Sequence, residues 1–387
     1  MRAIHVITRL IVGGAQQNTV ATVLGLQDKP DIETTLLAGP TSGPEGSVES
    51  AFRDNPKLLT VIPSLVRPIN PPMDLIALNR LTQHFRKARP DFVHTHSGKA
   101  GILGRLAARR AKVPIIVHTI HGPSFGPFQG RFANAVFLAA ERRAGAVTTH
   151  FVSVADAMTR QYLAAGIGSP EKYTRIFSGF ELAPFLNASN DPQFRARLGI
   201  APSDFVIGKI ARLFHLKGHH DLIDAAAGIV KKHPQTKFLL VGDGILREQL
   251  QHRVQDEGLE KYFIFAGLVS PEEIPRYIGV MDVVVHLSRR EGLPRALPQA
   301  LAARRPVVAC DCDGASEVCI SGETGFLIAP GDREALTERL TQLAENPDLR
   351  RQMGERGQDF TRQNFPVQTM VDNIYNLYRK LAGLTLQ

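Results

Sequence analysis

The sequence feature that most constrains the fold lies at residues 282–306, DVVVHLSRREGLPRALPQALAARRP. It begins with a short apolar run rich in valine, typical of a strand that is buried on both faces of a parallel sheet. A polar loop follows, then a predicted helix over about 294–303 and a new strand over 306–310. This succession predicts an open α/β sheet, which binds ligands at the carboxyl ends of its strands.

The loop in this stretch carries one carboxylate, Glu291, followed by Gly292, which allows a ligand to approach the backbone closely. The helix after it begins with free N–H groups at a positive dipole end, and this arrangement suits an anion such as phosphate. A carboxylate beside a phosphate-ready helix end indicates a phosphorylated polyol as the ligand.

The same strand-and-helix alternation runs through the rest of the chain and restarts near residue 204. A length of 387 residues exceeds the size at which a single core keeps growing, so two domains are expected. The fold class that we predict is α/β, with two Rossmann-like doubly wound domains facing each other across a cleft. The expected boundaries are a first domain over 1–180, a linker over 181–200, a second domain over 201–365, and a C-terminal helix over 366–387 that can cross back to the first domain.

Charge is distributed unevenly within the net +9. Residues 1–190 carry 21 Lys and Arg against 12 Asp and Glu, whereas residues 191–387 carry 25 of each. A basic face attracts a phosphorylated substrate or an anionic membrane surface. Nucleic acid is not an expected partner, because the basic residues are not interleaved with stacking aromatics and no known binding module is present.

The lengths of the apolar runs indicate where the protein is located, and the number of cysteines bears on disulfide formation. No apolar run reaches the ~18 residues that would span a bilayer, and the chain reads directly into a strand without a signal segment. We therefore expect a cytoplasmic protein. Two basic helical segments, at 98–112 and 130–145, have apolar stripes, so contact with the inner face of the membrane is a further option beside simple packing on a sheet. The odd number of cysteines argues against a disulfide framework.

Cations follow the first strand of the second domain in the segment ARLFHLKG. Arg212 and Lys217 flank the start of a predicted helix, where a fork-shaped and a point-like cation can neutralise a diphosphate without a metal. Near the N-terminus, Gly13 and Gly14 open another helix directly after a strand, which is a weaker phosphate-binding pattern. Asp311 and Asp313 imitate a metal-binding Asp-x-Asp pair, but they precede a Gly-Ala-Ser helix start, and we favour a capping role.

Four histidines cluster around two predicted strand ends, His94, His96, His118 and His121. Their spacings match those of metal ligands, yet residues on extended strands alternate between faces and no acidic residue lies near them. We favour the interpretation without a metal. His121, which lies where the chain leaves its strand, is the most suitable of the four to face the ligand.

Taken together, the motifs resemble those of the retaining family 4 glycosyltransferases, which have the GT-B fold. The resemblance covers nearly the whole chain, and the segments that carry it fit in order and spacing: GGAQ at 13–16, VHTHSGKAGILGR, HTIHG, ARLFHLKG, VGDG, FAGLV, SRREGLP and TGFLIAP.

The resemblance implies roles for the residues that bind the donor. Glu291 would contact the hydroxyls of the donor sugar, and the backbone at Gly292 and Leu293, with Arg212 and Lys217, would hold the diphosphate. Enzymes of this kind usually need no divalent metal and no cofactor beyond the nucleotide sugar.

In the first domain the resemblance implies that Gly14 lets the leaving phosphate approach and that His121 reaches the sugar from the acceptor side. One departure concerns the second glutamate of the family pattern, which binds the nucleotide ribose and which is Gln299 here. Eight residues from Glu291 correspond to about two helical turns on a similar face. An amide can still accept a hydrogen bond, so we expect retained activity with altered nucleotide affinity.

The function that follows is sugar transfer from a nucleotide diphosphate sugar, with a UDP-sugar favoured, to a hydroxyl of a glycan or a lipid-linked acceptor. Assembly of a surface polysaccharide or glycolipid is the expected setting, and the loops at 39–47 and 122–130 are expected to select the acceptor. Two alternatives stay open: a nucleotide-sugar epimerase of the same fold, and a sugar-nucleotide-binding protein with weakened catalysis.

Overall fold

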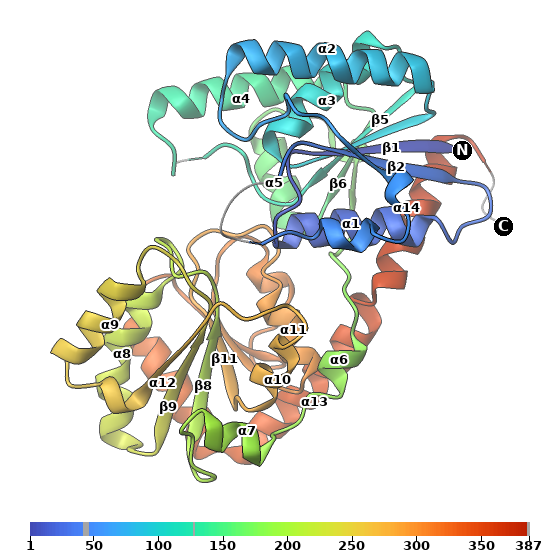
Figure 1. Cartoon of the computed structure of the whole chain (residues 1–387). Helices are drawn as coiled ribbons and strands as arrows, with labels where there is room; N and C mark the ends of the chain where they lie inside the picture. Colours follow the sequence, from blue (N-terminus) through green and yellow to red (C-terminus); the bar gives the residue numbers. More distant parts are fainter. Residues whose placement is uncertain (42–45, 127, 385–387) are drawn as a thin grey trace. The chain divides into compact units, whose positions relative to one another are not determined.

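The computed structural model describes residues 1–41, 46–126 and 128–384, and the chain divides into two compact units (Figure 1). The first unit comprises Met1–Phe180 and Val367–Gln387, and the second comprises Glu181–Pro366. Both are Rossmann-like, with a parallel sheet between helices, which confirms the α/β class and the two Rossmann-like units predicted from the alternation.

Among the described residues, the first unit has a seven-stranded sheet in the order β3-β2-β1-β4-β5-β6-β7. Its strands are β1 Arg2–Ile7, β2 Glu33–Ala38, β3 Leu59–Val61, β4 Phe92–His96, β5 Ile115–Ile120, β6 His150–Ser153 and β7 Tyr173–Arg175. The short edge strands β3 and β7 were not anticipated, because three residues carry too little periodicity to be recognised. The strand order reverses beside β1 and β4, which is where open α/β sheets bind ligands.

Helices cover both faces of this sheet. They are α1 Gly14–Leu26, α2 Pro71–Ala88, α3 Gly98–Arg110, α4 Arg131–Gly145, α5 Asp156–Ala164 and α14 Val367–Leu381, with short 3-10 turns at Glu49–Phe52, Pro56–Leu58 and Pro170–Lys172. One apolar cluster joins the sheet to α2 and α3, and another joins its opposite face to α1 and α14. The C-terminal helix is therefore part of the core of the first unit, with Tyr378 fully buried.

Over the described residues, the second unit has a six-stranded sheet in the order β10-β9-β8-β11-β12-β13. Its strands are β8 Phe205–Ile210, β9 Thr236–Val241, β10 Phe263–Gly267, β11 Val283–His286, β12 Val307–Cys310 and β13 Gly325–Ile328. Its helices are α6 Ala183–Leu186, α7 Pro192–Arg197, α8 His219–Lys232, α9 Arg247–Asp256, α10 Ile274–Gly279, α11 Ala296–Ala302, α12 Arg333–Glu345 and α13 Pro347–Asn364, with 3-10 turns at Glu260–Tyr262 (η4) and Asp313–Glu317 (η5). The predicted strand in the stretch at 282–306 is β11, the central neighbour of β8.

Residues 181–200, expected to be a linker, contain the helices α6 and α7 and belong to the second unit. Phe185 and Phe194 are buried there, and Arg195 donates hydrogen bonds to three backbone carbonyls. The composition of this segment resembles that of a linker because aspartate and proline also begin helices. Here Asp191 is the N-cap residue of α7, and Pro192 follows it.

Parts of the loops at 39–47 and 122–130, namely residues 42–45 and 127, and the last three residues of the C-terminal segment lie outside the described residues. Cys310, Cys312 and Cys319 are free thiols, in agreement with the prediction that the chain has no disulfide framework. None of the helices formed by the described residues is long and apolar enough to cross a membrane.

Candidate active site

Glu291 lies in the loop between β11 and α11, which we call the Glu291 loop (residues 287–295). The backbone N–H of Glu291 donates to Oδ2 of Asp313 at 2.7 Å, and the backbone N–H of Gly314 donates to the carbonyl oxygen of Gly292 at 3.1 Å. The N-cap position of η5 is Cys312, whose side chain makes no capping bond. The capping role favoured for Asp313 was therefore wrong: its carboxylate holds the Glu291 loop, from a position 22 residues away in sequence.

The carboxylate of Glu291 pairs with the ammonium of Lys217, and His286 Nε2 lies 3.6 Å from the same oxygen. Burial raises the pKa of Glu291, but Lys217 and His286 lower it by more in sum, so the pKa ends below its ordinary value. Burial lowers the pKa of His286 to about 4. The site therefore holds an ionised carboxylate, a paired ammonium and a neutral imidazole at neutral pH.

Lys217 reaches Glu291 because the loop after β8 lies directly against the end of β11. Gly218 has a left-handed φ of 66°, and a Cβ atom at this position would lie 2.2 Å from the carbonyl oxygen of Leu287. The amide of Arg289 donates to the carbonyl of Leu216 at 2.8 Å. A glycine at 218 is thus required for the close approach that joins the two loops.

Arg212 precedes Lys217 in the same loop and is exposed. Its guanidinium lies 4.9 Å from the centre of the Phe214 ring, and its carbonyl accepts a hydrogen bond from His219 Nε2 at 2.9 Å. No acidic residue of the described chain forms an ion pair with it. Arg212 is therefore held by its backbone while its guanidinium can bind an anion.

Two amides of the Glu291 loop are free to donate. Among the described residues, no acceptor takes the N–H of Gly292 or of Leu293, although both residues are buried. Buried amides without a partner are rare in proteins, so this pair of donors fits an anionic ligand.

The helix that follows begins at Ala296, two residues later than predicted, and ends at Ala302. Glu291 therefore precedes the helix, and the expected two helical turns between Glu291 and Gln299 were wrong, because residues 291–295 form a loop. Gln299 lies in the middle of α11 and is partly exposed.

In the first unit, His121 follows β5 directly and is half-buried. Its Nε2 lies 3.0 Å from Nδ1 of His96, whose Nε2 lies 3.0 Å from Nδ1 of His5 on β1. Burial lowers the pKa of His121 and of His5 to about 3, so both rings are neutral at pH 7. Gly14, the other residue predicted in this unit, begins α1 after the extended N-cap residue Gly13.

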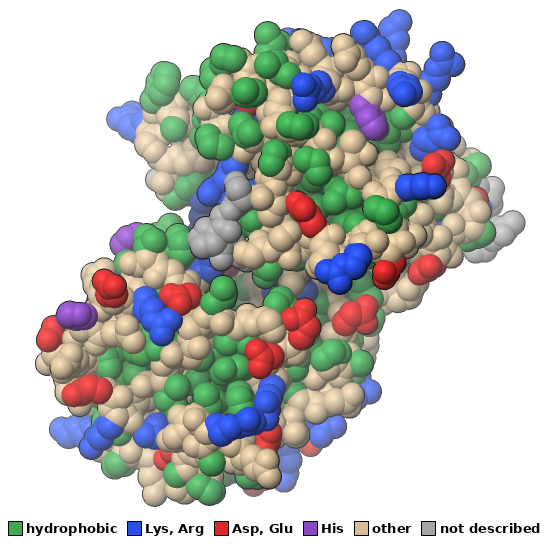
Figure 2. Space-filling model, viewed as in Figure 1, with side chains coloured by type: hydrophobic (Ala, Val, Ile, Leu, Met, Phe, Trp, Pro, Cys, Tyr) green, Lys and Arg blue, Asp and Glu red, His purple; other side chains and the backbone are tan. Residues whose placement is uncertain are grey.

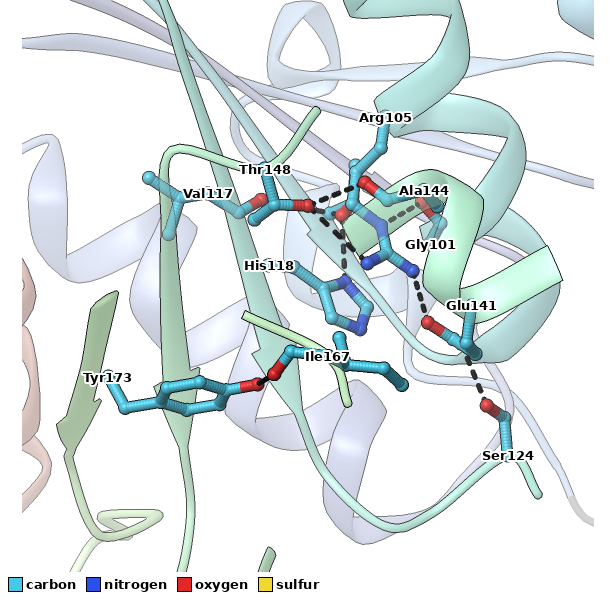
Figure 3. Close-up of polar contacts among 11 residues, drawn as sticks. Gly101, Arg105, Val117, His118, Ser124, Glu141, Ala144, Thr148, Ile167 and Tyr173 are labelled. Atoms are coloured by element: carbon cyan, nitrogen blue, oxygen red, sulfur yellow. Dashed lines mark hydrogen bonds and ion pairs between the residues drawn. The ribbon is translucent and has the colours of Figure 1, made fainter. Parts of the chain in front are cut away.

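The loop after His121 is held by a fully buried ion pair between α3 and α4 (Figure 3). Arg105 Nη2 lies 2.6 Å from Glu141 Oε2, and the other carboxylate oxygen accepts from Ser124 Oγ at 2.7 Å. Both side chains of this pair are fully buried, and each charge faces the other. Gln129 Nε2 donates to the carbonyl of Ser124 at 2.7 Å and adds a second tie within the loop.

A cavity of about 460 Å³ opens at the carboxyl edge of the first sheet. Its polar wall includes Arg9, Arg67 and the ion pair of Lys99 with Asp74, and its apolar wall comes from Ile102 and its neighbours on α3 and α4. Arg9 and Arg67 add positive charge, whereas the charge of Lys99 is offset by Asp74, so this cavity suits an elongated, partly apolar molecule that carries a negative charge.

Three of the groups that support the site, His286, His5 and Tyr378, were not predicted from the sequence. His286 ends an otherwise apolar strand, and a polar residue in that position is a signal that could have identified it. His5 and Tyr378 join His94 and His96 only because β1 pairs with β4 and α14 packs behind them. Ring nitrogens of His5, His94 and His96 lie within 4.8 Å of one another, a grouping that could hold a metal ion.

Each of the two units matches the model of a known protein family. Residues 190–360 match the family model of glycosyl transferases group 1, and residues 13–178 match that of the glycosyl transferase 4-like domain. The chain is 30% identical over 321 residues to the UDP-Gal:alpha-D-GlcNAc-diphosphoundecaprenol alpha-1,3-galactosyltransferase of Escherichia coli, covering 82% of each chain. It is 26% identical over 316 residues to the capsular polysaccharide biosynthesis glycosyltransferase CapM of Staphylococcus aureus, covering 79% of this chain and 80% of CapM.

Among solved structures, HepE of Anabaena in complex with UDP-glucose superposes with a TM-score of 0.82 at 23% identity, covering 98% of this chain and 100% of HepE. This likeness concerns the fold. The sequence relatives and the two family models together show that the chain belongs to the glycosyl transferases group 1 family with a 4-like N-terminal domain, and that it is a glycosyltransferase.

Proposed function

We propose that the enzyme transfers a hexose-type sugar from a UDP-sugar to an acceptor hydroxyl with retention of the anomeric configuration. The observation that carries the proposal is the Glu291 loop, where an ionised carboxylate, a paired lysine and two free amides converge. The E. coli relative is named for a UDP-Gal donor, and HepE was solved with UDP-glucose, which supports the choice of base.

The chemistry follows from the charges in the loop. Loss of the nucleotide diphosphate develops negative charge, and pre-positioned donors that meet this charge are usually the largest catalytic contribution. Arg212, Lys217 and the amides of Gly292 and Leu293 are such donors in this proposal, and no divalent metal is invoked. Glu291, kept ionised by Lys217, would accept hydrogen bonds from sugar hydroxyls and so fix the sugar for attack.

For the acceptor, we propose a lipid-linked glycan in surface polysaccharide or glycolipid assembly. The relatives named above act on an undecaprenol-linked sugar and in capsular polysaccharide synthesis. The cavity of the first unit combines an apolar wall with Arg9 and Arg67, and this combination suits a lipid diphosphate.

A peripheral position at the inner face of the membrane belongs to the same proposal. Ile69 and Leu75 near the start of α2 and Phe132 and Val136 on α4 are exposed, with Phe132 at 84%. On the face in view, Figure 2 shows hydrophobic side chains spread over the first unit with Lys and Arg side chains among them. Apolar side chains flanked by cations are typical of interfacial binding to anionic lipids.

A kinetic comparison tests the donor site. Lys217→Ala should lower kcat/KM by more than tenfold, because a hydrogen bond to a charged group contributes ~1.5–3 kcal/mol. The matched control is Lys231→Ala, an exposed lysine on α8, which should leave kcat/KM unchanged. Equal rates for both variants would remove Lys217 from the mechanism.

A thermal-shift panel of UDP, GDP, ADP and their sugars with EDTA present tests the base and the need for metal. Ligand at ~100 Kd adds about 2.7 kcal/mol of stability. A shift with UDP compounds alone supports the proposal, and a shift that EDTA abolishes contradicts its metal-free site. Turnover of the donor without any acceptor would instead indicate an epimerase.

Gln299 supplies a further test. The wild type should be active, and Gln299→Glu should tighten UDP binding. Inactivity of the wild type with every donor, combined with activity of Gln299→Glu, would identify the natural chain as a binding protein.

A further inference from the structure

Six buried or half-buried groups of the first unit form one continuous hydrogen-bonded chain, which we call the histidine chain. Its members, in order, are Thr119, His94, Tyr378, His5, His96 and His121. The five links measure 2.6 Å (Thr119 Oγ1 to His94 Nε2), 2.6 Å (His94 Nδ1 to Tyr378 Oη), 3.2 Å (Tyr378 Oη to His5 Nε2), 3.0 Å (His5 Nδ1 to His96 Nε2) and 3.0 Å (His96 Nδ1 to His121 Nε2).

The parallel sheet brings these groups together. β1 pairs with β4 so that His5 lies opposite His94, and β4 pairs with β5 so that His96 lies opposite Thr119. Tyr378 enters from α14, in the cluster that joins this helix to the sheet. The histidine chain therefore connects the C-terminal helix to His121, the residue that follows β5.

All its rings are neutral at pH 7. Burial lowers the pKa of His5 and His121 to about 3 and lowers the pKa of His94 and His96 well below its ordinary value. Burial also raises the pKa of Tyr378 well above its ordinary value, so the phenol keeps its hydrogen. Each neutral imidazole has one N–H and one bare nitrogen, and each hydroxyl has one O–H.

Six groups supply six hydrogens for five links, so one hydrogen remains outside the links, on Thr119, on Tyr378 or on His121. It lies on Tyr378 only if that oxygen accepts from both His94 and His5, and the fully buried hydroxyl would then donate to no acceptor among the described residues. Two arrangements remain, with the hydrogen at one end of the histidine chain or at the other. In the first arrangement it is on Thr119, and every ring carries its hydrogen on Nε2. In the second it is on Nδ1 of His121, and every ring carries its hydrogen on Nδ1.

The burial of the Thr119 hydroxyl decides which of these two arrangements is favoured. Thr119 is 3% exposed, and among the described residues its hydroxyl has no partner other than His94. In the first arrangement this buried O–H would donate to nothing, a loss that shifts the balance by about fivefold to a hundredfold. In the second arrangement Thr119 donates to His94, and the remaining hydrogen lies on Nδ1 of His121, a half-buried residue whose Nδ1 has no hydrogen-bond partner among the described residues.

We propose that the histidine chain fixes the tautomer of His121, so that this residue presents an Nδ1–H donor rather than a base. Thr119, His94, Tyr378, His5 and His96 are positioning residues that act through His121. What His121 meets rests on the proposed transferase function: as a donor it binds a hydroxyl or phosphate oxygen of the substrate, and it does not remove the acceptor proton.

A metal ion on His5, His94 and His96 is the rival explanation of this cluster. All six nitrogens of these three rings are already used in the links, so a metal would have to replace several hydrogen bonds at once. Elemental analysis of the purified protein decides this: a stoichiometric transition metal bound there would overturn the proposal.

The tautomer can be measured without substrate, by NMR of the protein labelled with ¹⁵N in its histidine rings. The signals of His121 are identified by their loss in His121→Gln. We expect its Nδ1 to carry the hydrogen and its Nε2 to be bare. A hydrogen on Nε2 in the resting enzyme overturns the proposal, whether or not the transferase function holds.

Variants test whether the histidine chain sets this state. Tyr378→Phe removes the middle link, so His121 should populate both tautomers. Tyr375→Phe is the matched control, one turn away on α14, because that hydroxyl donates to Asp31 at 2.5 Å outside the histidine chain. If Tyr378→Phe does not fold, Thr119→Val should weaken the preference and Thr119→Ser should restore it. An unchanged tautomer in both Tyr378→Phe and Thr119→Val contradicts the proposal.

Activity gives a second readout. With the substrate found for the transferase, Tyr378→Phe should lower kcat/KM by about five- to tenfold, the value of one hydrogen bond, while Tyr375→Phe stays at the wild-type rate. A shifted tautomer together with unchanged kcat/KM would leave the transferase function intact and show that His121 does not act on the substrate.

Discussion

The two units differ in the charge of the polar groups at their sites. In the first unit the groups beside His121 are neutral rings that burial keeps uncharged, whereas in the second unit Glu291 and Lys217 form an ion pair at a partly open strand end. Neutral rings tolerate full burial if every nitrogen has a partner, and charges need an opposite charge close by. The first site is thus built for directed hydrogen bonds and the second for binding charge.

The largest expected effect is on the acid stability of the first unit. Its rings His5, His94, His96, His118 and His121 have lowered pKa values, so below the unfolded pKa of 6.5 the unfolded chain binds protons that the folded unit does not. The free energy of unfolding of the first unit is therefore at its full value above pH 6.5. It falls as the pH drops towards 3, by ~1.4 kcal/mol per pH unit for each ring.

The second unit contains two comparable rings, His219 and His286, with pKa values of about 3 and about 4. Hydrogen–deuterium exchange at pH 7 and at pH 5 should therefore show peptides of the first unit losing protection first. Loss of protection in the second unit at a higher pH would contradict the comparison.

The next effect is expected at a fully buried ion pair of the first unit, Arg105 with Glu141, which departs from the pattern of neutral groups. Glu141→Gln leaves the guanidinium buried without a counter-charge and should reduce the free energy of unfolding by about 3–5 kcal/mol. Urea unfolding measures this, with the exposed Glu171→Gln as control. Replacement of both partners by apolar residues should recover much of the loss, and a mild effect of Glu141→Gln alone would show that water reaches the pair.

A smaller effect is expected at Lys209 on β8, which is 1% exposed and has no hydrogen-bond partner for its ammonium among the described residues. Burial lowers its pKa to about 7. Lys209→Met should stabilise the second unit by about 1–3 kcal/mol at pH 7, since the attraction of Asp221 and Glu291 offsets part of the burial cost.

Thermal unfolding should show this gain as a higher Tm, by ~2–4 °C for each kcal/mol. The advantage should shrink as the pH rises from 7 to 10.5, because the unfolded chain then loses the proton that the folded lysine has already released. Lys237→Met, on the neighbouring strand, is the control, since its ammonium is bound to the carbonyl of Lys261. A destabilised Lys209→Met would mean that the ammonium has a role in the site.

The sequence by itself determined the α/β class, the positions of most strands and the residues that open the two loops of the donor site. Apolar runs such as 283–287, and glycines such as Gly218, are local signals, because strand burial and backbone freedom depend on the residue itself. The same holds for Glu291, Lys217 and His121, which stand at the ends of strands.

Only the tertiary structure decided the partners of these groups. Asp313 holds the Glu291 loop, Tyr378 meets His5 and His94, and Glu141 buries Arg105, each across a gap in sequence that no local pattern spans. Strand order and helix packing bring them together, and the hydrogen-bond polarity of His121 depends on that arrangement. The sequence determines which chemical groups are present. The direction of their hydrogen bonds and their charge states depend on the groups that lie beside them in the folded protein.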